Sequence, residues 1–267
     1  MALPSPVDVA VAMARIQPAL DAVRHPGVRV LEVDGAYVTF DPSDKAEFAS
    51  TNRNRALIPG LSGRCGRGAI EAIQTAFAER GIARYFVWVS PCEGAEAALA
   101  ALHASDMRAV DWMEYPTLVR GTEPMPLPSI DGEVRRVNAE EAARWRPSLD
   151  IVFGSSSERF RRGSALENFD HYVVLEGGEP VAAAALCNSG SVSYLFAGTV
   201  RESHRGRGYQ RALIAARIDR AAERGSEWCI SETVGSPAYS LGNLLRCGFV
   251  ESFRKQVFEQ GSPPGAH

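Results

Sequence analysis

Two segments of different periodicity meet at Thr199-Val200-Arg201-Glu202-Ser203-His204-Arg205-Gly206-Arg207-Gly208-Tyr209-Gln210. The residues before the junction, 192–200, are mostly β-branched or aromatic, which predicts a strand. The residues after it, 209–224, repeat apolar side chains at helical spacing, which predicts a helix. Gly206 and Gly208 lie between them and allow the backbone to approach a ligand closely. Because a helix N-terminus adds free N–H groups and a positive dipole end, the junction predicts a phosphate-binding loop.

The loop resembles a motif of the GCN5-related N-acetyltransferases. In that family the pyrophosphate loop reads Arg/Gln-x-x-Gly-x-Gly/Ala, follows a bulged strand and opens a helix. Arg205 and Gly208 stand at the first two fixed positions, whereas Gln210 replaces the usual Gly or Ala. The resemblance implies an α/β (α+β) fold with a mixed, mostly antiparallel sheet between helices. It also implies acetyl-CoA as the co-substrate and direct transfer of its acetyl group to an amine.

The resemblance further indicates which residues hold acetyl-CoA. Backbone N–H groups cradle the pyrophosphate at Arg205, Gly206, Arg207, Gly208, Tyr209 and Gln210. The side chains of Arg205 and Arg207 add charge-assisted contacts. Gly198 predicts a bulge or splay in the preceding strand. In the family such a splay exposes backbone that pairs with the pantetheine arm and polarises the thioester carbonyl, which here assigns Gly198, Thr199 and Val200.

A second motif lies near the end of the chain, at Ser240-x-x-Asn243-x-x-Arg246-x-Gly248-Phe249. It resembles the ending of a subset of these acetyltransferases. Ser240, Asn243 and Arg246 are spaced to share one face of a helix. Asn243 and Ser240 are therefore candidates for contacts with the cofactor arm. The alternative is that they cap or pin the last strand, since Ser and Asn often bond locally.

Catalysis by this route needs a base for the amine and an acid for the departing thiolate. Glu232, in a strand that borders the splay of the resembled fold, is the candidate base, with an exposed strand-end glutamate as the alternative. Tyr194 is a second candidate, or else a wall aromatic. Many family members carry a tyrosine four residues before the Gly-Phe pair, but Leu244 stands there in this chain. Tyr239 and Ser240 are the remaining candidates for the acid.

The first half of the chain echoes the second. Ala-Glu-Arg-Gly ends a helix at 78–81 and again at 222–225, and a strand, a helix and a strand follow each time. This pattern predicts a duplicated domain. We expect a degenerate acetyltransferase-like domain at 1–120, a proline-rich linker at 121–130, a catalytic domain at 131–260 and a disordered tail at 261–267.

The first copy departs from the family pattern at its own glycine-rich loop, residues 63–68. Gly63 occupies the Arg/Gln position, and residues 57–60 read as a turn rather than a strand. Gly66 and Gly68 then only permit a tight turn into the next helix. We therefore expect the N-terminal loop to bind no cofactor.

Composition narrows the function classes. The net charge of −3 gives no basic footprint for nucleic acid. The five cysteines are scattered without metal-ligand spacing, which predicts no metal site and favours reduced thiols in the cytoplasm. No stretch is apolar for long enough to span a bilayer.

The resulting hypothesis is an acetyl-CoA-dependent N-acetyltransferase that acts on a small-molecule amine or a peptide amine. Its rival is a non-catalytic acyl-CoA sensor or interaction module, which the absent tyrosine favours. Residues 150–163 mix aromatic and basic side chains in the region that covers the acceptor site in the family. They face either an acidic substrate or solvent. The sequence leaves the acceptor and the oligomeric state open.

Overall fold

The computed structural model describes residues 2–24, 28–41, 54–110, 115–145, 167–233 and 239–261. The expected acceptor cover at 150–163 and nearly all of the expected tail at 261–267 lie outside these residues. The chain forms two compact units. Unit one comprises Met1–Leu3, Ala19–Pro26 and Thr117–Glu251, and unit two comprises Pro4–Pro18, Gly27–Pro116 and Ser252–His267.

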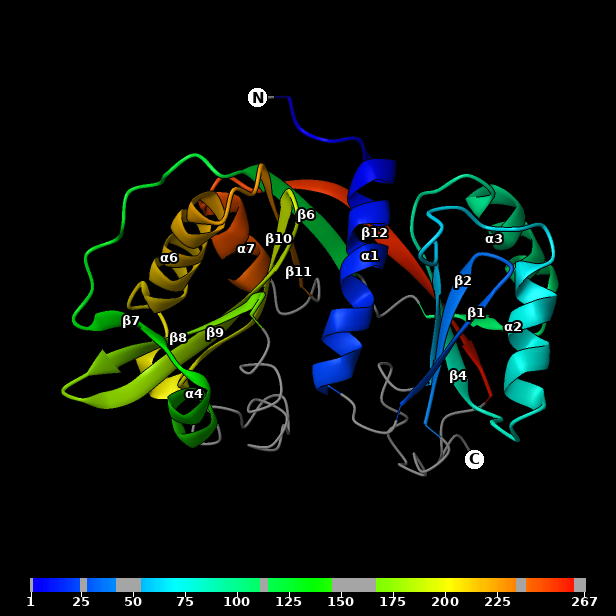
Figure 1. Cartoon of the computed structure of the whole chain (residues 1–267), viewed down its shortest axis with the longest axis horizontal. Helices are drawn as coiled ribbons and strands as arrows, with labels where there is room; N and C mark the ends of the chain where they lie inside the picture. Colours follow the sequence, from blue (N-terminus) through cyan, green and yellow to red (C-terminus); the bar gives the residue numbers. More distant parts are fainter. Residues whose placement is uncertain are drawn as a thin grey trace. The chain divides into compact units, whose positions relative to one another are not determined.

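Unit one is built on a mixed sheet (Figure 1). Its strands lie in the order β6 (Tyr115–Gly121), β11 (Trp228–Glu232), β10 (Val192–Val200), β9 (Glu179–Ser189), β8 (Phe169–Glu176) and β7 (Glu133–Val137). Only β10 and β11 run parallel among these neighbours, and the other pairs are antiparallel. The mostly antiparallel sheet expected from the family resemblance is confirmed.

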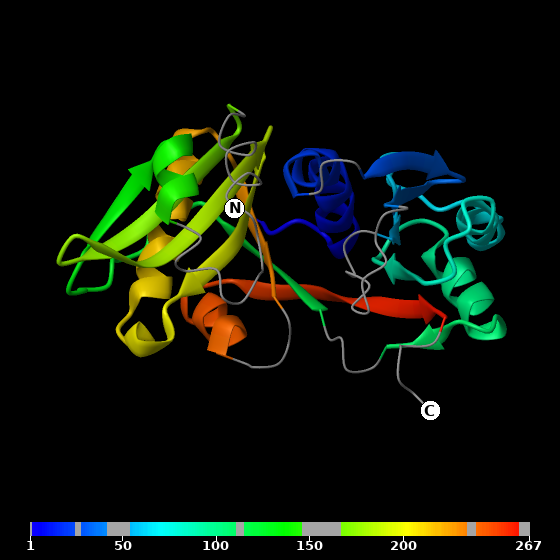
Figure 2. The same ribbon diagram turned by 90° about the horizontal axis from the view of Figure 1, so that it is seen from below.

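Helices cover both faces of this sheet (Figures 1 and 2). Helix α6 (Tyr209–Glu223) packs with Val174 in one cluster, and α4 (Ala139–Trp145) packs with Val173 in another. Successive strand residues point to opposite faces, so the two helices lie on opposite sides. Helix α7 (Tyr239–Arg246) joins α6 through Leu244, which packs with Ile214 and Ile218.

Unit two repeats the strand pattern. Its strands are β1 (Arg29–Val33), β2 (Ala36–Phe40), β3 (Arg55–Ile58), β4 (Tyr85–Val89) and β12 (Val250–Gln260), with the short β5 (Arg108–Ala109) also paired to β12. Strands β3 and β4 are parallel, and the other described pairs are antiparallel. Helices α2 (Ala69–Ala78) and α3 (Ala95–Ala104) pack on this sheet through a core that includes Ile73, Phe77 and Leu102.

One sequence prediction for the first half needs correction. The segment expected to be a turn before the first glycine-rich loop contains β3, which ends at Ile58 before a cis Ile58–Pro59 peptide bond. Helix α1 (Pro6–Arg24) is one continuous element that contains Pro18. Ser5 caps this helix, because the Asp8 amide donates to Ser5 Oγ at 3.2 Å.

The last strand of each half pairs within the other half's unit. Strand β6 follows the helices of the first half but pairs with β11, from Thr117↔Glu232 to Gly121↔Trp228. Strand β12 ends the second half but pairs with β4, from Gln256↔Val89 to Gln260↔Tyr85 (Figure 2). We call β6 and β12 the crossing strands. Domain boundaries at 120 and 131 remain a prediction, but each unit contains a strand from the opposite half of the sequence.

Candidate functional site

Strands β10 and β11 separate part-way along their length. Their parallel pairing runs from Val192↔Trp228 to Leu195↔Ser231. Past Leu195, β10 continues along β9, whereas Glu232 continues along β6. The pairing of β10 with β11 therefore ends before β10 does, as the splay of the resembled family leads us to expect.

A bulge in β10 accompanies the separation. Its register against β9 shifts between Phe196 and Thr199. The predicted bulge is confirmed, but its left-handed residue is Ala197, with φ of 51°, rather than Gly198. A side chain with φ in this range is uncommon and costs free energy unless surrounding contacts hold it. A Cβ on Gly198 would meet only Arg217 Nη2, at 3.9 Å, so Gly198 leaves space beside the bulge.

The phosphate-loop candidate follows directly. The short helix η2 (Glu202–His204) leads into Gly206 and Gly208, both left-handed, with φ of 80° and 85°. The Ala212 amide donates to the Gly208 carbonyl at 3.0 Å, so the amides of Tyr209, Gln210 and Arg211 precede the first helical hydrogen bond. Nothing lies within 4 Å of a Cβ built on Gly206, so this glycine faces open space.

Three predicted side chains meet where the loop approaches α7. Gln210 Nε2 donates to Ser240 Oγ at 3.1 Å, and Asn243 Nδ2 donates to Gln210 Oε1 at 2.7 Å. The guanidinium of Arg205 lies 5.6 Å from the ring centre of Tyr239. Gln210, the departure from the family motif, therefore links α6 to α7 through two hydrogen bonds. Ser240 and Asn243 thus bond to Gln210 at the start of α6, a contact different from the pinning of the last strand that the sequence offered as the alternative.

Glu176, at the end of β8, holds the other side of the loop. It accepts hydrogen bonds from Tyr209 Oη at 2.6 Å and from Arg207 Nη1 at 3.0 Å, and His204 Nε2 lies 3.5 Å away. The bond from Tyr209 is the largest cause that lowers the pKa of Glu176, and the same bond raises the pKa of Tyr209. The guanidinium of Arg207 thus pairs with a carboxylate, and the buried ring of Tyr209 leaves only its amide for a ligand.

The candidate base lies at the end of β11. Glu232 is half-buried, and its carboxylate accepts from Thr117 Oγ1 at 2.9 Å and from Tyr194 Oη at 3.4 Å. Tyr194 stacks on Phe196, with ring centres 5.5 Å apart, at the bulge. Glu232 is therefore oriented by two hydroxyls rather than fully exposed. Thr117 was missed in the sequence because it belongs to a crossing strand, far from Glu232 in the chain.

A second residue missed in the sequence is Arg217, on the buried face of α6. Its side chain is 3% exposed and donates to backbone carbonyls, among them the Phe196 carbonyl at the bulge. The sequence did contain a signal for this residue. Arg217 lies within the apolar repeat of Ile214, Ile218 and Ala221, and a charged side chain on an apolar helix face indicates a buried, hydrogen-bonded role.

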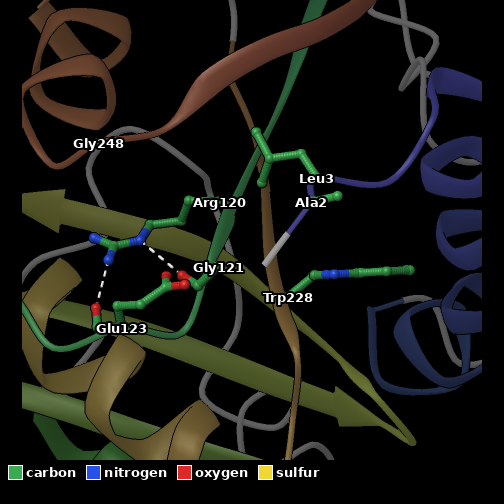
Figure 3. A pocket seen from close by; sticks show the side chains of 7 residues that line it. All are labelled: Ala2, Leu3, Arg120, Gly121, Glu123, Trp228 and Gly248. Atoms are coloured by element: carbon green, nitrogen blue, oxygen red, sulfur yellow. Dashed lines mark hydrogen bonds between the residues drawn. The ribbon is translucent and has the colours of Figure 1, made fainter.

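A hollow of about 240 Å³ lies at the other end of β11 (Figure 3). It is lined by Ala2, Leu3, Arg120, Gly121, Glu123, Trp228 and Gly248. Arg120 is tied to backbone carbonyls, with Nε donating to Gly121 at 2.8 Å and Nη1 to Cys247 at 2.6 Å. The lining contains none of the predicted site residues, so the hollow is separate from the candidate site.

Within the described part of the chain, no group of three or more His, Cys, Asp or Glu side chains is placed to hold a metal ion. Among the helices that the structure describes, none has the length and apolar character needed to cross a membrane.

Comparison with known proteins agrees with this geometry. A family model described as the acetyltransferase (GNAT) family matches residues 139–249. A GCN5-related N-acetyltransferase from Kribbella flavida is similar in structure, with a TM-score of 0.67 and 17% identity over 100% of this chain and 98% of its own. One from Sphaerobacter thermophilus has a TM-score of 0.60 and 16% identity, over 96% and 93%.

A tandem GNAT protein from the clavulanic acid biosynthesis pathway is also similar, with a TM-score of 0.63 and 12% identity over 98% of this chain and 96% of its own. A search of curated proteins finds no match. At these identities the solved structures support the fold alone. The stretch that matches the model of the acetyltransferase (GNAT) family, residues 139–249, contains the bulged strand, the glycine loop and α7.

Proposed function

We propose that the protein is an acetyl-CoA-dependent N-acetyltransferase whose site lies in unit one. One observation carries the proposal. A single continuous segment supplies both the end of β10 that no longer pairs with β11 and the loop whose amides can bind phosphate. Strand β10 leaves β11 after Leu195, and Gly206 and Gly208 follow before α6 begins at Tyr209. An extended arm and a diphosphate, joined as they are in coenzyme A, fit these two features in that order.

Each part of the segment has a binding role in this proposal. The amides from Gly206 to Arg211 hold the diphosphate, with the positive end of the α6 dipole behind them. Arg205 adds its charge. Arg207 acts from behind the loop, through Glu176, rather than on the phosphates. The backbone of Gly198, Thr199 and Val200 pairs with the pantetheine arm and polarises the thioester carbonyl.

For the chemical step, Glu232 takes a proton from the amine, directly or through a water molecule. The amine nitrogen then attacks the thioester carbonyl, a C–N bond forms, and the C–S bond breaks. The sulfur leaves with a proton from Tyr239 or Ser240, which begin α7, and the proton that the newly bonded nitrogen loses restores that hydroxyl. The hydrogen bonds from Thr117 and Tyr194 hold the Glu232 carboxylate at the opening, where its charge favours a cationic amine. The acceptor in this proposal is a small-molecule or peptide amine in the cytoplasm.

We further propose that unit two is a degenerate copy. From the crossing strand inward, its strand pattern β12, β4, β3, β2, β1 matches β6, β11, β10, β9, β8 in order and direction. Helix α2 joins the parallel strands of unit two, as α6 joins those of unit one. The similar full-length structures support this view through fold alone.

The first glycine-rich loop is already filled by the protein itself. The Gly66 amide donates to the Asp34 carbonyl at 2.8 Å, and the Cys65 amide donates to the Glu93 carbonyl at 2.9 Å. A Cβ built on Gly66 would lie 1.8 Å from Asp34 Oδ1, so a carboxylate occupies the concave side of this loop. A phosphate could bind there only by displacing the Asp34 carboxylate, which is itself negatively charged. We therefore expect one acetyl-CoA per chain, in unit one.

The test is calorimetric titration of acetyl-CoA into the wild type and three variants. We expect a stoichiometry of one in the wild type, and in Gly206→Asp we expect binding to be lost or weakened at least about fivefold, since unit charges about 4 Å apart repel by about 1 kcal/mol even in water. Asp tolerates left-handed backbone, and Gly206 has room for it. Gly190→Asp is the matched control, because Gly190 also has a positive φ of 61° and open space.

Gly68→Asp, in the first loop, should also leave binding intact. Unchanged affinity in folded Gly206→Asp, or a stoichiometry of two, contradicts this assignment of the cofactor site.

One observation favours the rival function, a non-catalytic acyl-CoA sensor. Leu244, which replaces the family tyrosine, is buried in the apolar core rather than presented to the site. Release of free thiol from acetyl-CoA in the presence of a panel of amines separates the two functions. An enzyme gives amine-dependent thiol release, whereas a sensor binds acetyl-CoA and releases none.

A further inference from the structure

We infer that Arg217 is a positioning residue for the pantetheine side of the acetyl-CoA site, an inference that rests on the proposed function. Arg217 lies in the third turn of α6, the helix that begins at the phosphate loop. It acts on the bulge of β10 through the backbone and does not touch the reacting atoms.

The contacts of Arg217 connect three elements. Its Nε donates to the Leu213 carbonyl of α6 at 2.9 Å, and its Nη1 donates to the Ala185 carbonyl of β9 at 3.1 Å and to the Phe196 carbonyl of β10 at 3.3 Å. Ala185 and Phe196 form the last register pair before the shift. The guanidinium therefore joins helix and sheet at the point where regular pairing stops.

Burial strengthens the hydrogen bonds that the Arg217 guanidinium donates. Arg217 is 3% exposed, so water competes little for its N–H groups. Hydrogen bonds from a charged donor are stronger than neutral ones, and they strengthen further in a poorly hydrated interior. The planar guanidinium reaches two strands at once, which a lysine ammonium cannot reproduce in the same arrangement.

The bulge needs such support. Ala197 adopts a left-handed φ of 51°, which its side chain disfavours, one residue after the carbonyl that Arg217 binds. The residues that follow, 198–200, are those assigned to the pantetheine arm. If Phe196 loses this bond, the strand end relaxes and its backbone no longer presents a fixed edge to the arm.

The phosphate loop has anchors of its own. Glu176 binds Arg207 and Tyr209, and Gln210 binds Ser240 and Asn243. These contacts do not involve Arg217. Loss of the Arg217 side chain should therefore weaken recognition of the pantetheine arm while sparing recognition of the diphosphate.

The test compares acetyl-CoA with 3′-phosphoadenosine 5′-diphosphate, which keeps the diphosphate but lacks the arm. In Arg217→Met we expect acetyl-CoA affinity to fall about ten- to hundredfold, the range for loss of a buried charged hydrogen bond. The nucleotide should bind within about twofold of wild type. Arg217→Lys keeps the charge, so its acetyl-CoA affinity should lie between that of the wild type and that of Arg217→Met. Arg220→Met is the matched control, because Arg220 lies on the same helix but pairs with Asp170 and Glu223.

A second measurement covers the case in which Arg217→Met does not fold. In the milder Arg217→Lys variant without ligand, amide hydrogen exchange at residues 197–201 should quicken, while the centres of β8 and β9 keep wild-type rates. Arg220→Lys should leave residues 197–201 unchanged. An equal loss of affinity for both ligands, or unchanged exchange in Arg217→Lys, overturns the inference and leaves the proposed function standing. A wild type that binds neither ligand overturns both.

Discussion

Glu232 shows how one residue acquires a role from residues distant in the sequence. It ends β11, and its carboxylate is held by Thr117 of β6 and Tyr194 of β10. A carboxylate that is oriented at an opening in a sheet suits proton transfer better than one that swings freely in solvent. The two hydroxyls are therefore part of any role that Glu232 has as a base.

We expect Glu232→Gln to lower turnover by about 10²–10⁴-fold while acetyl-CoA affinity stays near wild type. The amide keeps the shape and still accepts from Thr117 Oγ1, but it cannot take the proton. Steady-state kinetics with a saturating amine, alongside titration of acetyl-CoA, provides the measurement. Glu179→Gln, at the start of β9, is a control at a glutamate outside the site. A rate within a few-fold of wild type would remove Glu232 from the mechanism.

The sequence predicts most residues of the candidate site but not the residues to which their side chains are hydrogen-bonded. Glycines 206 and 208 and the strand bulge follow from local patterns, because turns and helix starts depend on neighbours in the chain. Arg207 was assigned to phosphate, yet it pairs with Glu176, 31 residues earlier. Nothing in the spacing of these two residues predicts their pairing. Thr117 was out of reach for the same reason.

At the scale of elements, the loop before α6 is held between the β8 hairpin end and α7. Glu176 fixes one side through Tyr209 and Arg207, and Gln210 fixes the other. A loop held on both sides presents its amides with little ordering cost when an anion binds. Glu176 is the one of these anchors that titrates in acid, so the loop should respond to pH.

The pKa of Glu176 is lowered from 4.5 in the folded protein, chiefly by the hydrogen bond from Tyr209. A lowered carboxyl pKa contributes stability above the unfolded value, and this contribution is lost as pH falls through the folded value. We therefore expect Glu176→Gln to be less stable than wild type at pH 7, with the difference shrinking below about pH 4.5. Urea unfolding between pH 3 and pH 7 measures it. A difference that stays constant over this range would contradict the linkage.

At the scale of the whole molecule, the two halves of the sequence exchange a strand. Unit one depends on β6 from the first half, and unit two depends on β12 from the second. The repeated Ala-Glu-Arg-Gly endings predicted a duplication, but no local pattern reveals which sheet a strand enters. The apolar residues of β12, at 250, 253, 257 and 258, do not alternate with polar ones, so its sequence does not assign it to a sheet and tertiary pairing decides.

The exchange of β6 and β12 predicts that the two halves of the chain stay associated when the linker between them is cut. We expect a protease site inserted beside Leu127, which is 55% exposed, to yield two fragments that elute together in native gel filtration and part only in denaturant. Each fragment then supplies a crossing strand to the other's sheet. Uncut protein is the control for elution volume. Fragments that separate without denaturant would contradict the strand assignment.

The crossing strands also set an order of events during synthesis. Strand β4 is complete once residue 89 has been made, but its partner β12 begins at residue 250. The first half therefore leaves the ribosome with its sheet unfinished and stays so until residues 250–260 have been made, contrary to the usual order in which N-terminal domains fold first. Unit one has no such delay, because β6 precedes its other strands. Truncation of the chain before residue 250 would thus leave unfinished the sheet that residues 29–89 mainly form.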